Sequence, residues 1–553
     1  MEAECTSRHG ARQEPRSDFP LAAEATLGFN SGMNTQHHPM RPASLPVAVI
    51  LVVVAGTLRG DEPAPPKPEA TAPADAALQE RVEHSVVQVF ATVRAPDLAR
   101  PWTKQPPAEV TGTGIVIEGK RILTNAHVVA YAGEVQVQAH GTGTKVGAKV
   151  VALGRGIDLA VLEVDDESLF EGREPLPRSR ELPGIEDAIL AYGYPAGGTN
   201  LSITKGIVSR IDFVDNRFET PSLRIQIDAA VNPGNSGGPA VTDGKLVGLV
   251  FSHLRNAQNI GYIIPTEEIE LFLADVADGV HDGKPRLPIT LWNLENPALR
   301  ASHGVPSGTT GVLVDAAWGD EPATRLEKSD VITHVGGERV DNQGMVSLPG
   351  MPRLSCLFMV QRATVEGRVP MTVLRAGVEQ QLDVPTTCVV PLVMPALAGE
   401  APRFFIYGPV AFSAATHQYA RGTTQSGELA AFLGARGNPL ISRMIDGPDF
   451  AGEELIVICA PLFPHPLSRG YGNPAGGVVA TVNGRKPKNL LDLVKLLRDS
   501  EEEFVTIEFA GTMAMPLVLP RKEAEAATET ILGDNGVRAQ GSPDALRVWA
   551  DGR

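Results

Sequence analysis

One serine in this chain lies in a stretch that is suited to a sharp backbone turn. The segment from Gln226 to Pro239 reads QIDAAVNPGNSGGP and surrounds Ser236 with glycines and small residues. Because glycine adopts backbone conformations that other residues avoid, such a segment can direct several amide N–H groups towards one point. A serine placed there can attack a carbonyl carbon while the amides of Gly234 and Ser236 hold the oxyanion. We therefore expect a nucleophile at Ser236 and an oxyanion hole in the segment Gly234, Asn235 and Ser236.

A base and an acid that match this serine lie upstream. Serine is a weak nucleophile until a base, itself oriented by a third group, removes its proton. His127 follows the apolar run 121–123, where a strand gives way to a turn, and Asp158 precedes the apolar run 161–164. The order His, Asp, Ser is that of chymotrypsin-type β-barrel proteases, whereas subtilisin-like enzymes and α/β-hydrolases use other orders. The predicted roles are general base and then acid for His127, and orientation of the imidazole for Asp158.

Each of the three blocks has an ordinary alternative when it is taken alone. The GNSGG run can be a glycine-rich turn, His127 a core or surface histidine, and Asp158 a turn or cap residue. Their order and their strand-rich context favour a triad. A protease fold that has lost its activity is a further alternative, although no triad position is substituted.

Together the blocks resemble those of the HtrA/Deg serine proteases, in which PDZ domains follow a trypsin-like domain. The layout is similar to that of the chloroplast-type plant Deg proteases. The resemblance implies an ATP-independent endopeptidase for unfolded or damaged polypeptides, a preference for small aliphatic residues before the cut, and a homo-trimer or higher homo-oligomer. The segment Asn259, Ile260 and Gly261 resembles the family's wall of the primary specificity pocket, and Gly261 leaves room for a substrate backbone to pair there.

Length, net charge and cysteine content limit the number of domains and argue against several classes of partner and cofactor. A chain of 553 residues is too long for one core and implies three or four domains. The net charge of −16 argues against nucleic acid or an anionic membrane as the main partner. The four cysteines are scattered without CxxC spacing, and no HExxH motif occurs, so we expect no metal, no cofactor and no disulfide framework. Cys356 and Cys388 could pair in an oxidising compartment, but buried free thiols are the preferred interpretation.

The N-terminal region indicates where the protein is directed and predicts no folded domain. Residues 1–39 are polar and irregular, and their acidic residues are unusual for an organelle transit peptide. Residues 40–60 follow the pattern of a signal peptide: one basic residue, a short apolar core and small residues at its end. We hypothesise that Met40 is the true start and that the protein is exported to the periplasm or another extracytoplasmic space, with no stable membrane span after signal removal. The alternative is a short N-terminal membrane anchor.

The rest of the chain predicts a mainly β protein, and the resemblance implies a chymotrypsin-like double β-barrel followed by two PDZ-like α+β domains. Short strands and glycine turns alternate through the first of these regions. The predicted parts are a disordered linker at 61–77, a protease domain at 78–280, PDZ domain 1 at 285–392, a diverged PDZ-like domain at 400–520, and a C-terminal tail at 521–553.

The loop Leu287, Pro288 and Ile289 matches the PDZ loop that grips a peptide's C-terminal carboxylate with backbone N–H groups. Proline has no N–H to donate, so we expect weak capture of free C-termini. A different class of function is a peptide-binding chaperone or PDZ scaffold with vestigial proteolysis. The intact triad disfavours that alternative.

Overall fold

The computed structural model describes residues 73–195, 198–214, 220–251, 261–317, 326–512 and 515–551. The predicted extension, the signal peptide and most of the linker lie outside these ranges, as do Asn259 and Ile260 of the predicted pocket segment. No helix in the described ranges combines the length and the apolar composition needed to cross a membrane.

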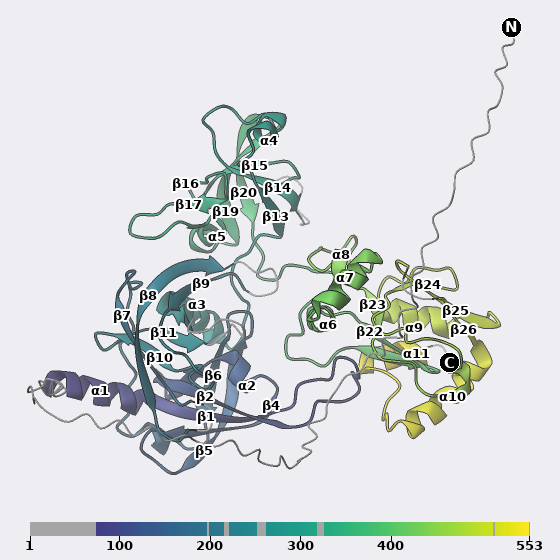
Figure 1. Ribbon diagram of the computed structural model, residues 1–553, viewed down its shortest axis with the longest axis horizontal. Coiled ribbons are helices and arrows are strands. Elements are labelled where there is room, and N and C mark those ends of the chain that lie inside the picture. The colour runs from purple at the N-terminus through teal and green to yellow at the C-terminus, as the bar shows by residue number, and fades with distance from the viewer. Residues whose placement is uncertain are drawn as a thin grey trace, which may run out of the picture. The chain divides into compact units, whose positions relative to one another are not determined.

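Six antiparallel strands close a first β-barrel in the order β1-β2-β3-β6-β5-β4 (Figure 1). Apolar side chains fill it, because alternate residues of a strand point to the same face and here that face is enclosed. A helix, α1 (Pro73–Ser85), leads into the barrel. The strands are β1 (Val86–Val93), β2 (Ala108–Ile117), β3 (Arg121–Thr124), β4 (Ala132–Ala139), β5 (Lys145–Gly154) and β6 (Leu159–Val164), with α2 (Ala126–Val129) after β3 and the short 3-10 helix η1 (Glu167–Phe170) after β6.

A second six-stranded barrel follows, closed in the order β10-β11-β12-β9-β8-β7. One buried cluster contains Leu123 and Leu159 of the first barrel together with Leu249 and Ile264 of the second, so the two barrels share part of their core. The predicted double barrel is thus confirmed. Its strands are β7 (Ala188–Gly193), β8 (Ser202–Val214), β9 (Ser222–Ile227), β10 (Pro239–Thr242), β11 (Lys245–Phe251) and β12 (Gly261–Pro265), followed by α3 (Thr266–Asp275) and η2 (Val276–Asp278).

A third sheet has the order β13-β14-β15-β19-β20, with β16 paired to β15. The β19–β20 hairpin turns at Ala376 and Gly377, and both turn residues have positive φ, as a tight two-residue turn requires. The elements are β13 (Ile289–Asn293), α4 (Pro297–Ser302), β14 (Val312–Ala317), β15 (Val331–Val335), β16 (Glu338–Arg339), β17 (Met345–Val346), β18 (Leu354–Ser355), α5 (Leu357–Ala363), β19 (Arg368–Arg375) and β20 (Val378–Pro385).

The C-terminal region contains two three-stranded sheets and most of the helices. The sheets have the orders β21-β22-β23 and β24-β25-β26. The elements are β21 (Phe404–Tyr407), β22 (Val410–Ala414), α6 (His417–Thr423), α7 (Gly427–Ala435), α8 (Pro439–Ser442), β23 (Ile456–Ile458), η3 (Pro466–Ser468), β24 (Val479–Val482), α9 (Leu490–Arg498), β25 (Phe504–Phe509), β26 (Leu517–Pro520), α10 (Arg521–Asp534) and α11 (Pro543–Ala550).

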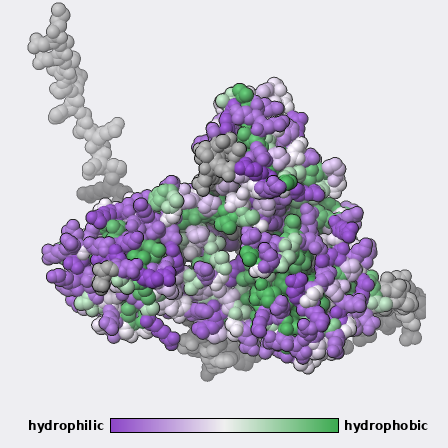
Figure 2. All heavy atoms as spheres, turned by 180° about the vertical axis from the view of Figure 1, so that it is seen from behind, coloured by the Kyte–Doolittle hydropathy of each residue, from purple (hydrophilic) through white to green (hydrophobic). Residues whose placement is uncertain are grey.

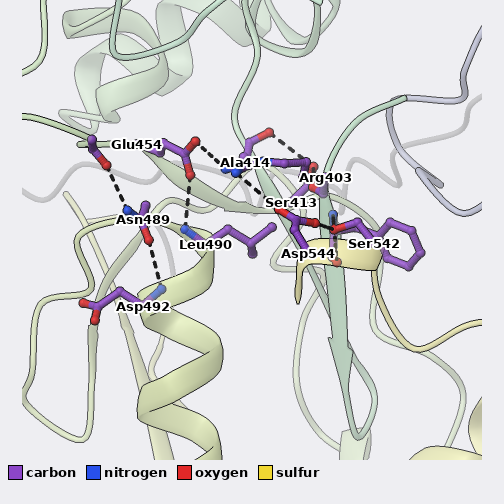
Figure 3. A network of polar contacts seen from close by, with 11 residues as sticks. Arg403, Ser413, Ala414, Glu454, Asn489, Leu490, Asp492, Ser542 and Asp544 are labelled. Atoms are coloured by element: carbon purple, nitrogen blue, oxygen red, sulfur yellow. Dashed lines mark hydrogen bonds and ion pairs between the residues drawn. The ribbon is translucent and has the colours of Figure 1, made fainter. Parts of the chain in front are cut away.

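The segment from 521 onwards, expected as a tail, is instead part of this C-terminal core. Ala524 and Ala545, from the two last helices, are buried in the same cluster as the strands. Polar contacts support the same packing: Figure 3 shows Arg403 between Glu454 and Asp544, so that the start of β21 is tied to the first turn of α11.

The surface is mixed. Figure 2 shows hydrophilic residues over most of the visible face, with hydrophobic residues gathered in patches. Among the exposed large apolar side chains, four belong to neighbouring strands of the second barrel: Leu190 on β7, and Ile203, Ile207 and Val214 on β8.

Candidate active site

His127 lies on the short helix α2, which begins two residues after β3 ends. Its neighbours Ala126, Val128 and Val129 are buried, and this anchors the helix to the barrel. The His127 side chain is 45% exposed. The local fold therefore holds the backbone rigidly and leaves one edge of the imidazole open to a substrate.

Asp158 accepts two hydrogen bonds from His127. Its Oδ2 lies 2.7 Å from the imidazole Nδ1, and its Oδ1 accepts the backbone amide of His127 at 2.9 Å. Because an ionised carboxylate only accepts, Nδ1 carries the proton and Nε2 is left as a base. Burial by itself would lower the pKa of His127, but the hydrogen bond and the charge of Asp158 outweigh it, and the pKa is raised.

The turn that carries Asp158 is held from both barrels. Asp158 has φ +65°, a left-handed conformation that is unfavourable for a residue with a side chain and persists only where neighbours hold it. Asn125 donates its Nδ2 to the Asp158 carbonyl at 2.9 Å. From the second barrel, the Arg224 guanidinium donates to the Ile157 carbonyl at 3.2 Å, and the Thr220 amide donates to the Gly156 carbonyl at 3.1 Å.

Arg224 is a residue that the sequence interpretation did not single out. It is only 6% exposed, and its guanidinium lies over the Phe251 ring at 5.0 Å. A buried charge needs such partners. The one signal in the sequence is an arginine within the strand SLRIQI, where apolar residues would be expected.

The serine turn connects β9 to β10. Gly234 and Gly237 have φ of +98° and +85°, and a Cβ on Gly237 would lie 2.0 Å from the Thr113 carbonyl oxygen. Only glycine fits at Gly237, because both the conformation and the space exclude a side chain. Ser236 is 5% exposed, so the turn is largely shielded from solvent at this residue.

The amides of this turn are used unequally. The Asn235 amide donates to the Asn232 carbonyl at 3.0 Å, so this member of the predicted oxyanion segment is engaged within the turn. The amides of Gly234 and Ser236 have no hydrogen-bond partner among the described residues. They are the two donors that remain for an oxyanion.

Strand β2 brings the serine turn and the histidine together. A Cβ on Gly112 would meet Val128, beside the histidine, at 2.8 Å and the Ser236 carbonyl at 3.3 Å. The two catalytic candidates are therefore neighbours across one glycine of β2. Within the described residues no hydrogen bond joins the His127 ring to the Ser236 hydroxyl; such contacts often tighten only when substrate binds.

The other predicted site residues form two segments, one at the start of β12 and one at the start of β13. Gly261 is buried at the start of β12 and pairs with Ile227, whereas Asn259 and Ile260 lie outside the described residues. In the second segment, the Ile289 amide donates to the Leu287 carbonyl at 2.9 Å, so it is already used, and Pro288 has no N–H. Leu287 and Ile289 line one cavity with side chains of α5, namely Leu357 and Val360.

Among the described residues, no group of three or more His, Cys, Asp and Glu side chains is placed to hold a metal ion.

The two barrels define a trypsin-like peptidase, and the comparisons with known proteins agree. A family model described as a trypsin-like peptidase domain matches residues 112–249, and one described as a PDZ domain matches residues 393–544. Protease Do-like 4, mitochondrial, of Arabidopsis thaliana is 34% identical over 469 residues, which is 84% of this chain and 86% of that protein. Protease Do-like 2, chloroplastic, of the same plant is 32% identical over 474 residues, or 85% of this chain and 76% of that protein.

Among solved structures, the HtrA-type protease AlgW with tripeptide is similar with 26% identity and a TM-score of 0.46, covering 58% of this chain and 98% of that one. On the curated relatives, the chain belongs to the HtrA/Deg family of serine proteases, the Do-like proteases. The resemblance inferred from the sequence is confirmed at this level, as is serine endopeptidase activity.

Proposed function

We propose that this protease is an ATP-independent endopeptidase that degrades unfolded or damaged polypeptides, and that Ser236, His127 and Asp158 are its catalytic triad. The observation that carries the assignment is the double hydrogen bond between Asp158 and His127, beside a serine turn in which the Gly234 and Ser236 amides have no partner among the described residues. The bond to Nδ1 fixes the imidazole so that Nε2 accepts a proton.

In the proposed mechanism, Ser236 Oγ attacks the scissile carbonyl carbon as His127 Nε2 takes the hydroxyl proton. The new C–O bond places the former carbonyl electrons on the oxygen, where the amides of Gly234 and Ser236 stabilise the negative charge. The imidazolium then gives its proton to the leaving amine as the C–N bond breaks. Water, with His127 again as the base, releases the acyl group from Ser236.

The proposed substrates are chains that are already unfolded, since an extended backbone is needed at the site. Gly261 begins β12, and a substrate strand can pair beside it in the manner of an added β-strand. Family resemblance supports small aliphatic residues before the cut. Hydrolysis of a peptide bond needs no nucleotide, and unfolding work is not required for such clients.

The same proposal includes assembly and location. We infer a homo-trimer or a higher homo-oligomer, supported by the family and by the exposed apolar side chains on β7 and β8. We also infer a location outside the cytosol, reached through the predicted export signal at 40–60. The names of the two Arabidopsis relatives place them in the mitochondrion and the chloroplast.

The test compares the wild-type protein with Ser236→Ala on unfolded casein, without nucleotide. Replacing serine with alanine removes the nucleophile and little volume, so the fold is expected to persist by circular dichroism. We expect casein cleavage by the wild type alone. Cleavage by neither protein would favour the chaperone or scaffold alternative, and equal cleavage by both, with contaminating proteases excluded, would refute the triad.

A further inference from the structure

We propose that Thr113 is a positioning residue that fixes the peptide groups of the oxyanion hole. The inference rests on the proposed function, because it concerns the same serine turn. Thr113 lies on β2, in the first barrel, and is fully buried at 0% exposure. It does not face the substrate, so any effect on catalysis passes through the residues that it binds.

The side chain of Thr113 makes two hydrogen bonds. Its hydroxyl donates to the Gly234 carbonyl at 2.7 Å and accepts the Tyr194 amide at 2.9 Å. A hydroxyl has one proton to donate, and this one is committed to the oxyanion loop.

The backbone of Thr113 makes two more. Its amide donates to the Ser236 carbonyl at 2.8 Å, and its carbonyl accepts the Thr124 hydroxyl at 2.6 Å. Thr124 is the last residue of β3 and stands three residues before His127. One buried residue therefore joins the serine turn of the second barrel to the strand that carries the histidine.

These contacts determine how the peptide groups of the turn face. The Gly234 carbonyl and the Asn235 amide belong to one planar peptide group, which is held at one end by Thr113 and at the other by Asn232. Rotation of this group changes ψ of Gly234 and φ of Asn235, and so moves the two flanking amides of Gly234 and Ser236 relative to each other. Because rotation at a glycine costs little free energy, hydrogen bonds from outside the peptide group are needed to keep both donors directed at one point.

The hydrogen bond from Thr113 to the Gly234 carbonyl matters for the reaction because an oxyanion donor acts only when it lies about 2.7–3.1 Å from the position of the developing charge. A donor that must first reorient loses part of its effect on the barrier. We therefore expect Thr113 to act on the transition state and not on ground-state binding of the peptide.

The test variant is Thr113→Val, which keeps the β-branched shape and both backbone hydrogen bonds. It leaves the Gly234 carbonyl and the Tyr194 amide buried without their partner. We expect kcat to fall about 10- to 100-fold with KM changed less than about two-fold, because losing a whole oxyanion donor costs about 100- to 1000-fold. Thr113→Ser, which restores the hydroxyl, is expected to recover most of the rate.

A second readout separates positioning from a merely structural role. A peptide aldehyde forms a tetrahedral adduct with the serine, whereas the corresponding peptide amide binds without one. We expect the affinity of Thr113→Val for the aldehyde to fall by the same factor as kcat/KM, and its affinity for the amide to stay unchanged. Thr333→Val is the matched control, since Thr333 is a buried strand threonine whose hydroxyl donates to the Thr372 carbonyl at 3.1 Å, far along the chain in the third sheet.

Rates are expressed per folded molecule by titrating the active fraction. Should Thr113→Val fold poorly, Thr113→Cys provides a similar side chain with a weaker donor, and a smaller loss of the same kind is expected. The inference is overturned if Thr113→Val or Thr113→Cys keeps the wild-type kcat and aldehyde affinity. It is also overturned if their loss is no greater than that of Thr333→Val. Failure of the triad itself is distinguished by Ser236→Ala, which in that case would retain its cleavage of casein.

Discussion

His127 must be neutral to accept the serine proton, so its pKa sets the acidic limit of the activity. The hydrogen bond and the charge of Asp158 raise that pKa above its ordinary value despite partial burial. As pH falls through the raised pKa, His127 becomes protonated and cleavage stops. We predict that the acidic limb of kcat/KM, which reports the free enzyme, lies above the pKa of an ordinary histidine.

Asp158→Asn tests the cause of this shift. Removing the charge is expected to move the acidic limb to lower pH and to reduce kcat by about ten-thousand-fold, the loss known for the equivalent change in a trypsin triad. The measurement is a pH profile of kcat/KM for a short peptide substrate in both proteins. An unmoved limb would mean that Asp158 does not set the protonation of the base.

At the residue scale, the triad candidates could be predicted because their order and local motifs are specific. Arg224 and Thr113 could not be predicted, because their roles depend on contacts between the two barrels that no local pattern records. Ser329 adopts φ +75°, a conformation that glycine adopts more easily than serine. Cys356 is buried, but Cys388 is exposed, contrary to the preferred interpretation of two buried thiols.

At the scale of elements, the loop before β13 carries a prediction about peptide binding. Pro288 offers no amide and the Ile289 amide already donates to Leu287, so a docked carboxylate would lose donors and keep part of its desolvation cost. We expect the Ser236→Ala protein, used to prevent cleavage, to bind a peptide with a free C-terminus no better than its amidated twin.

Pro288→Gly in the same background is expected to raise affinity for the free-carboxylate peptide alone. Pro297→Gly, at the first turn of α4, is the control for removing a proline elsewhere in this part of the chain. The affinities of each protein for the free-carboxylate peptide and for its amidated twin can be measured by isothermal titration calorimetry. A strong preference of the unmodified loop for the free carboxylate would defeat the prediction.

Element types were predictable where the pattern is local. The strands at 86–93 and 245–251, the hairpin at Ala376 and the amphipathic helix α9 follow from alternation, turn residues and helical spacing. The helix α10 was missed as a packed element because it is rich in alanine and glutamate, and Ile531 is the only large apolar residue among the three that it buries. The helix α11 was missed although it places Val548 and Trp549 against the same core, which is an amphipathic pattern that the sequence does carry. Thr266 is the first residue of α3, and its hydroxyl donates to the Ser179 carbonyl at 2.9 Å, a contact that no local pattern indicates.

At the scale of the whole molecule, the N-terminal residues carry a prediction about location. The segment that begins at Met40 is expected to direct export and to be cleaved between Ala55 and Gly60, where small residues allow a signal peptidase to act. N-terminal sequencing of the protein from its native cell measures this. A mature chain that starts at Met1 would contradict export, and one that retains residues 47–54 would indicate an anchor.

The arrangement of the two barrels follows from the sequence only in part. The strand patterns indicate that barrels form, whereas the packing of one barrel against the other is a tertiary property. The shared core of Leu123, Leu159, Leu249 and Ile264 sets the geometry between His127 on one barrel and Ser236 on the other. The proposed active site is therefore a property of the assembled pair and not of either barrel alone.

Reaction with a fluorophosphonate tests the central assignment most directly, because the reagent modifies only a serine that an adjacent base activates. We expect one phosphonyl group per chain, mapped by peptide mass spectrometry to Ser236, and no labelling of His127→Ala. Labelling at another serine, or no labelling of a preparation that still cleaves casein, would contradict the account.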